Sequence, residues 1–379
     1  MQTPHRWFGA GHSTAADSGE AGAEAAASAI GGRTPELVLV FCSPRHDLPA
    51  LLLSVRAEAG PEATVVGATT LGELAYDGVS DGGVAVAALG GAGFSVRTRI
   101  SHIRDVGHRQ AGAAAAEAMA GVSHPHSVLI LLADGMAGEP HEVVRGAYAV
   151  VGATVPMVGG FAGATVQFVD ETLVEDAVIG VALGSDGPIG IGVAHGWRRM
   201  EPPMVVTRSS GGTVYELDDE PALDVLLRRT GLATAAELFD RERNTIRGIG
   251  LSRRNGEDMR ELVEGDDAAR WVRSPADVPQ GTLCWLMDDD PGGLVGGAAE
   301  SCEEAVEGLG GKTPLGALAF DCADRRRRLG AEGARAEMAA MRAALGSAPY
   351  AGFYTSAEIA RVRGALGTHH LSLVTLAVA

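Results

Sequence analysis

Residues 37–67, LVLVFCSPRHDLPALLLSVRAEAGPEATVVG, contain the signals of a compact folding unit. The first six residues form a continuous apolar run rich in β-branched and aromatic side chains, which is typical of a buried strand. A helical pattern follows over 48–59, and the run ATVV then predicts a second strand that leads into a loop at Gly67. After the turn SDGG, the run VAVAAL at 84–89 predicts a third strand. We therefore expect a β-loop-α-β-loop-β unit over residues 37–89.

The same order of signals occurs twice more. The strand SVLILL at 127–132 precedes an expected helix over 141–151, and the strand LGALAF at 315–320 precedes one over 334–345. In all three units a glycine follows the second expected strand: Gly67, Gly159 and Gly352. Repetition in a matched order indicates that one structural unit is used three times.

These signals predict an α/β fold of two domains, with mixed β-sheets built from three repeated β-loop-α-β-loop-β units. The N-terminal domain, residues 1–200, would hold the units 37–89 and 127–184. The C-terminal domain, residues 201–379, would hold the unit 315–378. A chain of 379 residues is too long for one ordinary core, which also favours two domains.

Composition excludes several classes of function. A net charge of −17 repels a polyanion, so we expect no nucleic-acid partner. No apolar run approaches the ~18 residues of a membrane span, and the acidic, alanine-rich N-terminus lacks the pattern of a secretory signal. The 4 cysteines form no C-x-x-C pair, and the single lysine, Lys312, disfavours Schiff-base chemistry. We expect a cytoplasmic protein with reduced cysteines.

The three glycine-bearing segments, 67–73, 159–163 and 352–358, are expected to be loops at the carboxyl ends of strands. Open α/β sheets usually bind their ligands there. If the three loops converge, their backbone N–H groups and threonine hydroxyls surround one cavity. The alternative is that the glycines only permit tight turns inside a repeated fold.

Three carboxylates accompany these loops. Glu73 and Glu358 occupy matching positions in two units, which favours a shared role in structure or binding. Asp134 follows a strand and could either contact a ligand or cap a helix. Together the three could orient an ammonium group, or two of them could serve acid–base catalysis if they face one another across a cleft.

Cysteine, arginine and histidine add further candidates. Cys322 has Arg325 three positions on, which would help a reactive thiol, but a buried structural role is favoured. The arginine run 325–328 is interpreted as a solvated turn, with an anion clamp as the alternative. His195 and His369 belong to no metal-binding motif, and a hydrogen-bonded core role is favoured for His195.

Several stretches together resemble the FIST family, whose name stands for F-box and intracellular signal transduction. The N-terminal ones are FCSP, GATTLGE, VGGFAG, AHGWRRM and VYELDDEPAL, and the C-terminal ones are FDCADR, GFYTSAEI and HHLSLVTLAV. The resemblance covers nearly the whole chain. It departs from the family pattern at Ala357, where glycine is usual, and at Ala68 and Thr69, where cysteine and serine are usual. The identity of the ligand therefore does not carry over.

The resemblance implies a bacterial, cytoplasmic, non-enzymatic sensor with FIST N-terminal and C-terminal domains. It would bind a small polar molecule such as an amino acid and act through a separate signalling protein such as a kinase or cyclase. Two alternatives stay open: a haem-binding nitric-oxide sensor, with His195 or His369 on the iron, and an enzyme that uses the loop carboxylates or Cys322. No other cofactor, metal or membrane is expected. The residues expected to bind the ligand are Gly67, Thr69, Thr70, Glu73, Asp134, Gly159, Gly160, Phe161, Cys322, Arg325, Tyr354, Thr355 and Glu358.

Overall fold

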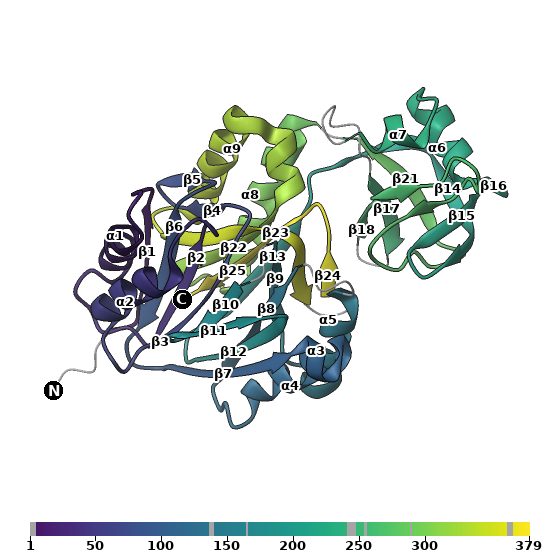
Figure 1. The fold of residues 1–379 in the computed structure, drawn as a ribbon. Helices are drawn as coiled ribbons and strands as arrows, with labels where there is room; N and C mark the ends of the chain where they lie inside the picture. The colour runs from purple at the N-terminus through teal and green to yellow at the C-terminus, as the bar shows by residue number, and fades with distance from the viewer. Residues whose placement is uncertain are drawn as a thin grey trace.

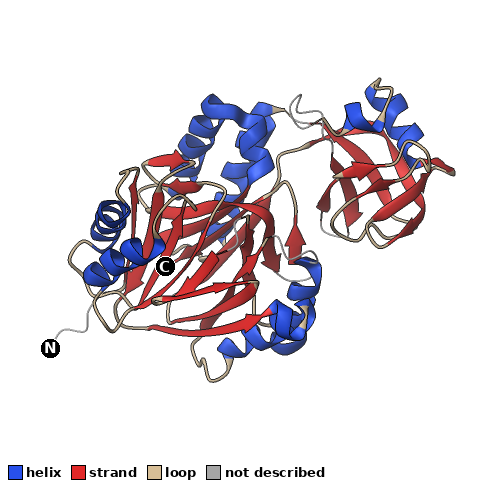
Figure 2. Cartoon of the chain, in the orientation of Figure 1, coloured by secondary structure: helices blue, strands red, loops and turns tan. Residues whose placement is uncertain are grey.

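The computed structural model of the chain describes residues 5–135, 140–163, 166–240, 248–253, 256–288, 290–361 and 367–379. Figure 1 shows two bodies, which we call the main body (residues up to 197 and from 290 onward) and the inserted body (residues 198–288). Helices lie against the outer faces of the strands of the main body (Figure 2). The expected α/β class with mixed sheets is confirmed. No helix in the described ranges is long and apolar enough to cross a membrane.

The first unit begins earlier than the sequence pattern indicated. An additional strand and helix precede LVLVFC, and the strands adopt the order β1-β6-β2-β3, with β2 parallel to β3 and antiparallel to β6. Asp17 caps α1 by accepting a hydrogen bond from the N–H of Glu20, and Gly31 ends the helix at φ 58°. The elements are β1 (Trp7–Ser13), α1 (Ser18–Ile30), β2 (Leu37–Cys42), α2 (Leu48–Ala59), β3 (Thr64–Thr69), β4 (Glu73–Ala75), β5 (Gly78–Ser80) and β6 (Val84–Gly90).

The second and third units have the same strand order. In the second it is β7-β12-β8-β9, and in the third it is β13-β25-β22-β23. The second comprises β7 (Phe94–His102), α3 (Ile103–Val106), α4 (His108–Ala116), a 3₁₀ turn (Glu117–Met119), β8 (His126–Asp134), α5 (Pro140–Val151), β9 (Met157–Ala162), β10 (Val166–Val169), β11 (Thr172–Glu175) and β12 (Ala177–Ser185). The third comprises β13 (Ile189–Ala194), α8 (Pro291–Glu307), β22 (Gly316–Cys322), α9 (Ala323–Leu345), β23 (Tyr350–Arg361), β24 (Gly367–His369) and β25 (Leu373–Val378).

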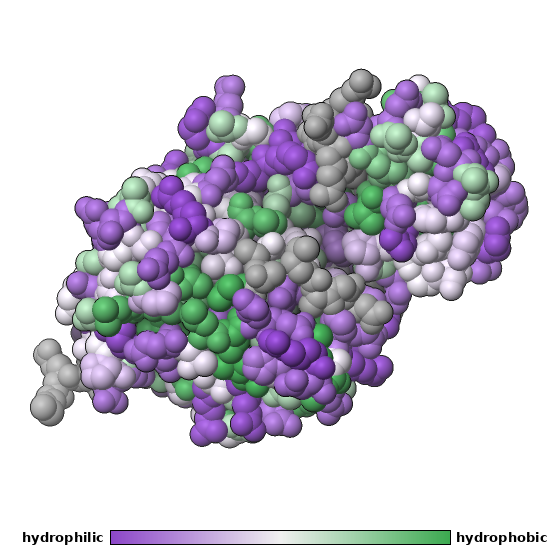
Figure 3. Space-filling model, in the orientation of Figure 1, coloured by the Kyte–Doolittle hydropathy of each residue, from purple (hydrophilic) through white to green (hydrophobic). Residues whose placement is uncertain are grey.

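The three units are joined in a closed cycle. A strand from the second unit, β10, pairs with β3 of the first, and β4 of the first pairs with β23 of the third. The second half of β23 pairs in turn with β9 of the second unit. A single hydrophobic core lies between the joined sheets and contains residues of all three units, such as Phe41, Ile130 and Phe320. Hydrophilic residues dominate the outer face shown in Figure 3, and apolar residues gather over the central strands of the main body.

The inserted body interrupts the third unit between β13 and α8. Its own core includes Val206, Leu226 and Leu286, and among the described strands its eight-stranded sheet shares none with the main body. Strand pairing in the main body joins segments on both sides of residue 200, the expected domain boundary, because β13 pairs with β25. The inserted elements are β14 (Arg198–Ser210), β15 (Thr213–Leu217), β16 (Glu220–Pro221), α6 (Ala222–Thr230), α7 (Ala235–Leu238), β17 (Gly248–Arg253), β18 (Gly256–Glu261), β19 (Glu264–Gly265), β20 (Val272–Arg273) and β21 (Leu283–Asp288).

The glycines expected in three loops lie within strands instead. Gly67, Gly159 and Gly352 belong to β3, β9 and β23 and pair with the neighbouring parallel strand. A Cβ atom at these positions would lie 1.9, 2.0 and 1.7 Å from a carbonyl oxygen of that strand. Real Cβ atoms never come so close, so only glycine permits this approach of two backbones. The loop interpretation is therefore wrong, and the shared glycine serves strand pairing.

The arginine run is helical. Helix α9 begins at Ala323, and Arg325 on its first turn is fully buried. The solvated-turn interpretation of residues 325–328 is therefore wrong. Composition alone does not distinguish a buried, ion-paired arginine from an exposed one. Gly330, at φ 61°, kinks the helix after this first segment.

Replacing Gly352 with alanine should lower the free energy of unfolding by about 1–3 kcal/mol or more, since the new methyl group overpacks the β22–β23 contact. Chemical denaturation measures the change. Gly296, on an exposed face of α8 with no atom within 4 Å of its would-be Cβ, is the matched control. Gly296→Ala should stabilise the protein by up to about 1 kcal/mol, because alanine favours the helix. Equal stability of Gly352→Ala and the natural protein would refute the close-approach explanation.

Candidate functional site

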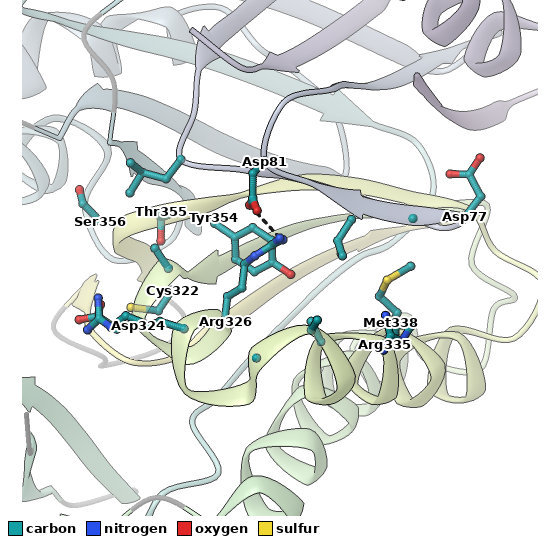
Figure 4. A pocket seen from close by; sticks show the side chains of 18 of the residues that line it. Asp77, Asp81, Cys322, Asp324, Arg326, Arg335, Met338, Tyr354, Thr355 and Ser356 are labelled. Atoms are coloured by element: carbon teal, nitrogen blue, oxygen red, sulfur yellow. Dashed lines mark ion pairs between the residues drawn. The ribbon is translucent and has the colours of Figure 1, made fainter. Parts of the chain in front are cut away.

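A cavity of about 1090 Å³, which we call the large cavity, lies between α9, the β4–β5 hairpin and β23 (Figure 4). Glu261, the last residue of β18, also lines it, so the inserted body contributes to the wall. The cavity therefore lies where the first unit, the third unit and the inserted body meet. Ligand sites occur preferentially at such junctions.

Strand β23 changes its partner beside this cavity. Its residues 351–353 pair with β4, and its residues from Thr355 onward pair with β9. The register with β9 shifts between Thr355 and Ala357, which makes Ser356 an irregular position. Bulges of this kind re-aim side chains next to binding sites. Tyr354, Thr355 and Ser356 all line the large cavity.

Helix α9 supplies the opposite wall. Arg335, Met338 and Arg342 follow helical spacing and line the large cavity together. The other side of the helix packs into the core through Met341 and Leu345. A helix that is apolar on one face and cationic on the other therefore places two arginines over the cavity.

The charges around the large cavity are only partly paired. Arg326 forms an ion pair with Asp81 at 2.7 Å, and Arg327 forms one with Asp324. Arg342 donates to the carbonyl of Tyr76 at 2.8 Å. Arg335 is exposed and has no ion pair within the part of the chain that the structure describes. The α9 wall thus offers guanidinium groups that no carboxylate neutralises.

Tyr354 provides an unsatisfied polar group in the cavity wall. Its side chain is fully buried, and its O–H proton has no acceptor; the guanidinium of Arg326 lies beside the hydroxyl but can only donate. Arg326 lies over the face of the ring, with its central carbon 4.7 Å from the ring centroid. Burial raises the pKa of Tyr354 well above its usual value, so the phenol stays protonated and can donate. An unpaired buried hydroxyl costs about 1–3 kcal/mol, which a ligand acceptor would recover.

A buried charge cluster lies at the base of α9. Arg325 donates to Asp321 at 2.8 Å and to Glu337 at 2.6 Å, and it also donates to the carbonyls of His195 and Leu294. All three charged side chains are fully buried. Arg325 is not among the residues that line the large cavity, and its bonds anchor the segment that leads into the inserted body.

Two carboxylates share one guanidinium in this cluster. Burial, and then the charge of Asp321, raises the pKa of Glu337 to about 8, and burial also raises the pKa of Asp321. One oxygen of each carboxylate has no hydrogen-bond partner. At neutral pH the pair therefore retains one proton and carries one negative charge, which balances the single positive charge of Arg325.

Glu73 and Glu358 have matching structural roles. Glu73 accepts hydrogen bonds from Thr70 at 3.0 Å, Ser80 at 2.8 Å and the N–H of Gly83 at 2.8 Å. Glu358 accepts from Thr355 at 2.6 Å and from the N–H of Ser372 at 3.1 Å. Burial raises the pKa of both carboxyl groups. Each carboxylate thereby accepts a hydrogen bond from the backbone N–H of the residue directly before the last strand of its unit.

In the second unit an aspartate from a different position, the end of β8, makes a similar bond. Asp134 accepts a hydrogen bond at 3.2 Å from the N–H of Asp176, which directly precedes β12. The shared task of the three acidic residues is thus to satisfy the backbone where the last strand of each unit begins. This explains the repetition of Glu73 and Glu358 without a ligand.

The three glycine-bearing segments do meet. A Cβ on Gly163 would lie 2.2 Å from the side chain of Leu71, and Ser356 donates to the carbonyl of Phe161 at 3.3 Å. Segments 67–73 and 352–358 both contribute to the large cavity, through Leu71 and through Tyr354 and its neighbours. Thr69 bonds to the backbone of Val166, Gly160 packs against Thr355, and Phe161 and Asp134 line a smaller, second cavity.

The candidates for reactive or metal-binding chemistry are placed as follows. Cys322 lines the large cavity, but burial raises its pKa well above the usual value, so it is not a thiolate. His195 accepts from the N–H of Trp197 at 2.9 Å, and His369 donates to the carbonyl of Ala360 at 3.0 Å. Neither histidine lines either of the two cavities, so they do not fit a haem bound there. The described residues contain no group of three or more metal-ligating side chains.

Sequence reasoning missed Arg335, Arg342 and Asp81. The two arginines are seven positions apart within the helix expected over 334–345, with Met338 between them. That spacing places all three side chains on one face of the helix, and it is the sequence signal from which they could have been predicted. Asp81 carries no such signal, because its position opposite Arg326 depends on how the units pack.

The pKa of Glu337 predicts a pH-dependent stability. Its pKa rises from 4.5 in the unfolded chain to about 8, so the group stabilises the fold fully at low pH, and this contribution is lost as the pH rises through about 8. Glu337→Gln removes the titrating group, so the stability of the variant relative to the natural protein should increase between about pH 6 and pH 9. Denaturation at the two pH values measures this difference. Glu62→Gln, an exposed control, should follow the natural protein, and parallel behaviour of Glu337→Gln would show that no buried proton is held.

Similarity to known protein families identifies the group to which this chain belongs. No curated protein matches the chain significantly. The crystal structure of cyanuic acid hydrolase from A. caulinodans is similar over 99% of both chains, at 11% identity and a TM-score of 0.40. The family model of the FIST N domain matches residues 36–220, and that of the FIST C domain matches residues 222–361. The chain therefore belongs to the FIST family.

Proposed function

We propose that this chain is a non-enzymatic sensor that binds a small polar ligand in the large cavity. FIST domains are small-ligand sensing domains of signalling proteins, which supports this class of function. The bound state would be passed to a separate signalling protein, such as a kinase or cyclase, in the cytoplasm of a bacterium. The large cavity suits this role because residues of two units and of the inserted body line it, so a ligand there contacts both bodies.

The unused O–H donor of Tyr354 is the observation that carries the proposal. A fully buried phenol whose proton has no acceptor is costly unless a bound molecule supplies one. Arg335 and Arg342 on the facing helix provide cationic donors for a carboxylate. Asp77, on the hairpin side, also lines the large cavity and can attract an ammonium group. An amino acid carries both charges and fits this arrangement.

The chemistry of the site favours binding over catalysis. Cys322 is held as a neutral thiol by burial, and Glu73 and Glu358 already use their oxygens for internal hydrogen bonds. A nucleophilic mechanism needs an activated group beside a base. Within the described residues, no histidine or lysine is hydrogen-bonded to any of these three side chains. A Soret band in the purified protein would instead favour the haem alternative.

Binding should depend on Arg335 and Tyr354. Native mass spectrometry of gently purified protein identifies a retained molecule, and calorimetric titration with each of the twenty standard amino acids measures affinity. Arg335→Gln should weaken the best binder by about 10-fold or more, and Tyr354→Phe by about 5-fold, because a charge-assisted and a neutral hydrogen bond are lost.

Arg99→Gln is the matched control. Arg99 is exposed on β7 and pairs with Glu117 at 3.2 Å, away from the residues that line the large cavity. Its replacement should leave affinity unchanged. Equal binding by the Arg335, Tyr354 and Arg99 variants would place the ligand elsewhere and refute the proposed site.

A further inference from the structure

A second cavity, of about 190 Å³, shares the wall residue Ser356 with the large cavity. We call it the small cavity. It lies where the second unit, the third unit and the inserted body meet, since it is lined by Phe161, Ala357 and Pro275 from these three parts. Its volume exceeds the ~150 Å³ of a cavity known to hold benzene, so a six-membered ring with one substituent fits.

His370 is the unusual group in this wall. The side chain lines the small cavity, only 1% of its surface is exposed, and neither ring nitrogen has a hydrogen-bond partner. Burial, and then the nearby charge of Arg260, lowers the pKa of His370 to about 3, so the ring is neutral. A neutral imidazole has one N–H donor and one nitrogen lone pair, and both are unused here.

The other polar side chains of the wall are His108, Asp134 and Ser356. The carboxylate of Asp134 is 6% exposed. Ser356 donates its proton to the carbonyl of Phe161, which leaves its oxygen lone pairs available. The unused lone pair of His370 and the oxygen of Ser356 are acceptors, so this part of the wall is complementary to a molecule that brings an O–H or N–H group.

The charges and the apolar walls restrict the ligand further. Arg260 near His370 disfavours a cation, and Asp134 disfavours an anion. The small cavity has an apolar wall that fits a hydrocarbon ring, formed by Pro140, Val143 and Phe161. The chemical class that satisfies all of these conditions is a small neutral molecule with an apolar body and one hydrogen-bond donor.

We propose that the small cavity is a second binding site, distinct from the large cavity, for a neutral phenol-sized molecule whose O–H or N–H group donates to a ring nitrogen of His370. Ser356 lines both cavities, so the two sites share one residue of β23. The proposal does not depend on which ligand occupies the large cavity.

Phenol and toluene are the probes that test it. Both have a ring of suitable size, but only phenol has a donor. In the full chain labelled at histidine ring nitrogens and valine methyls, phenol should shift the signals of His370 and Val143 saturably. Toluene should bind at least about 5-fold more weakly, the effect of one lost hydrogen bond.

His370→Phe removes the ring nitrogens and keeps an aromatic ring of similar size. In this variant the Val143 signals should report equal binding of phenol and toluene. Arg99→Gln, on exposed β7 and lining neither cavity, should leave the phenol titration unchanged and serves as the control. The proposal is overturned if phenol gives no saturable shift, which would mean that only water occupies the small cavity, or if phenol and toluene bind the natural protein equally.

Discussion

The shared pairing of β23 is the constraint on which the rest of the structure depends. This strand lies parallel to β22 in its own unit, and its outer edge pairs first with β4 and then with β9. One strand thereby holds all three units together. At the change of partner the ladder is interrupted, and Tyr354, Thr355 and Ser356 are placed there. Both cavities lie against this interruption, so the geometry that closes the main body also creates the candidate sites.

The repeated residues stabilise the units. Gly67, Gly159 and Gly352 permit two parallel backbones to come closer than any side chain allows. Glu73 and Glu358 satisfy the backbone where the last strand begins. What differs among the units is what gives the cavities their chemistry. Helix α9 of the third unit carries arginines over the large cavity, and α5 of the second unit presents Pro140 and Val143 to the small one.

Local periodicity was sufficient to predict much of the fold. The strand 37–42 and the helix 48–59 have the bounds expected from their apolar patterns, because each depends on nearby residues. The length of β23 could not be predicted. Its residues TSAEI read as a loop because their strand character comes from pairing with β9, which is distant in the sequence. The inserted body was hidden for the same reason: β13 and α8 belong to one unit although residues 198–288 separate them.

The candidate site was only partly predictable. Tyr354, Thr355 and Cys322 do line the large cavity, as expected of ligand-binding residues, but Arg325 is used in a buried ion cluster. Burial and pairing of an arginine are set by tertiary packing, which composition does not report. A high-resolution crystal structure of the protein purified with its natural ligand would decide the role of the large cavity. The account predicts an acceptor atom of that ligand within hydrogen-bond distance of the Tyr354 hydroxyl. A large cavity filled only by water, with the ligand bound elsewhere, would contradict it.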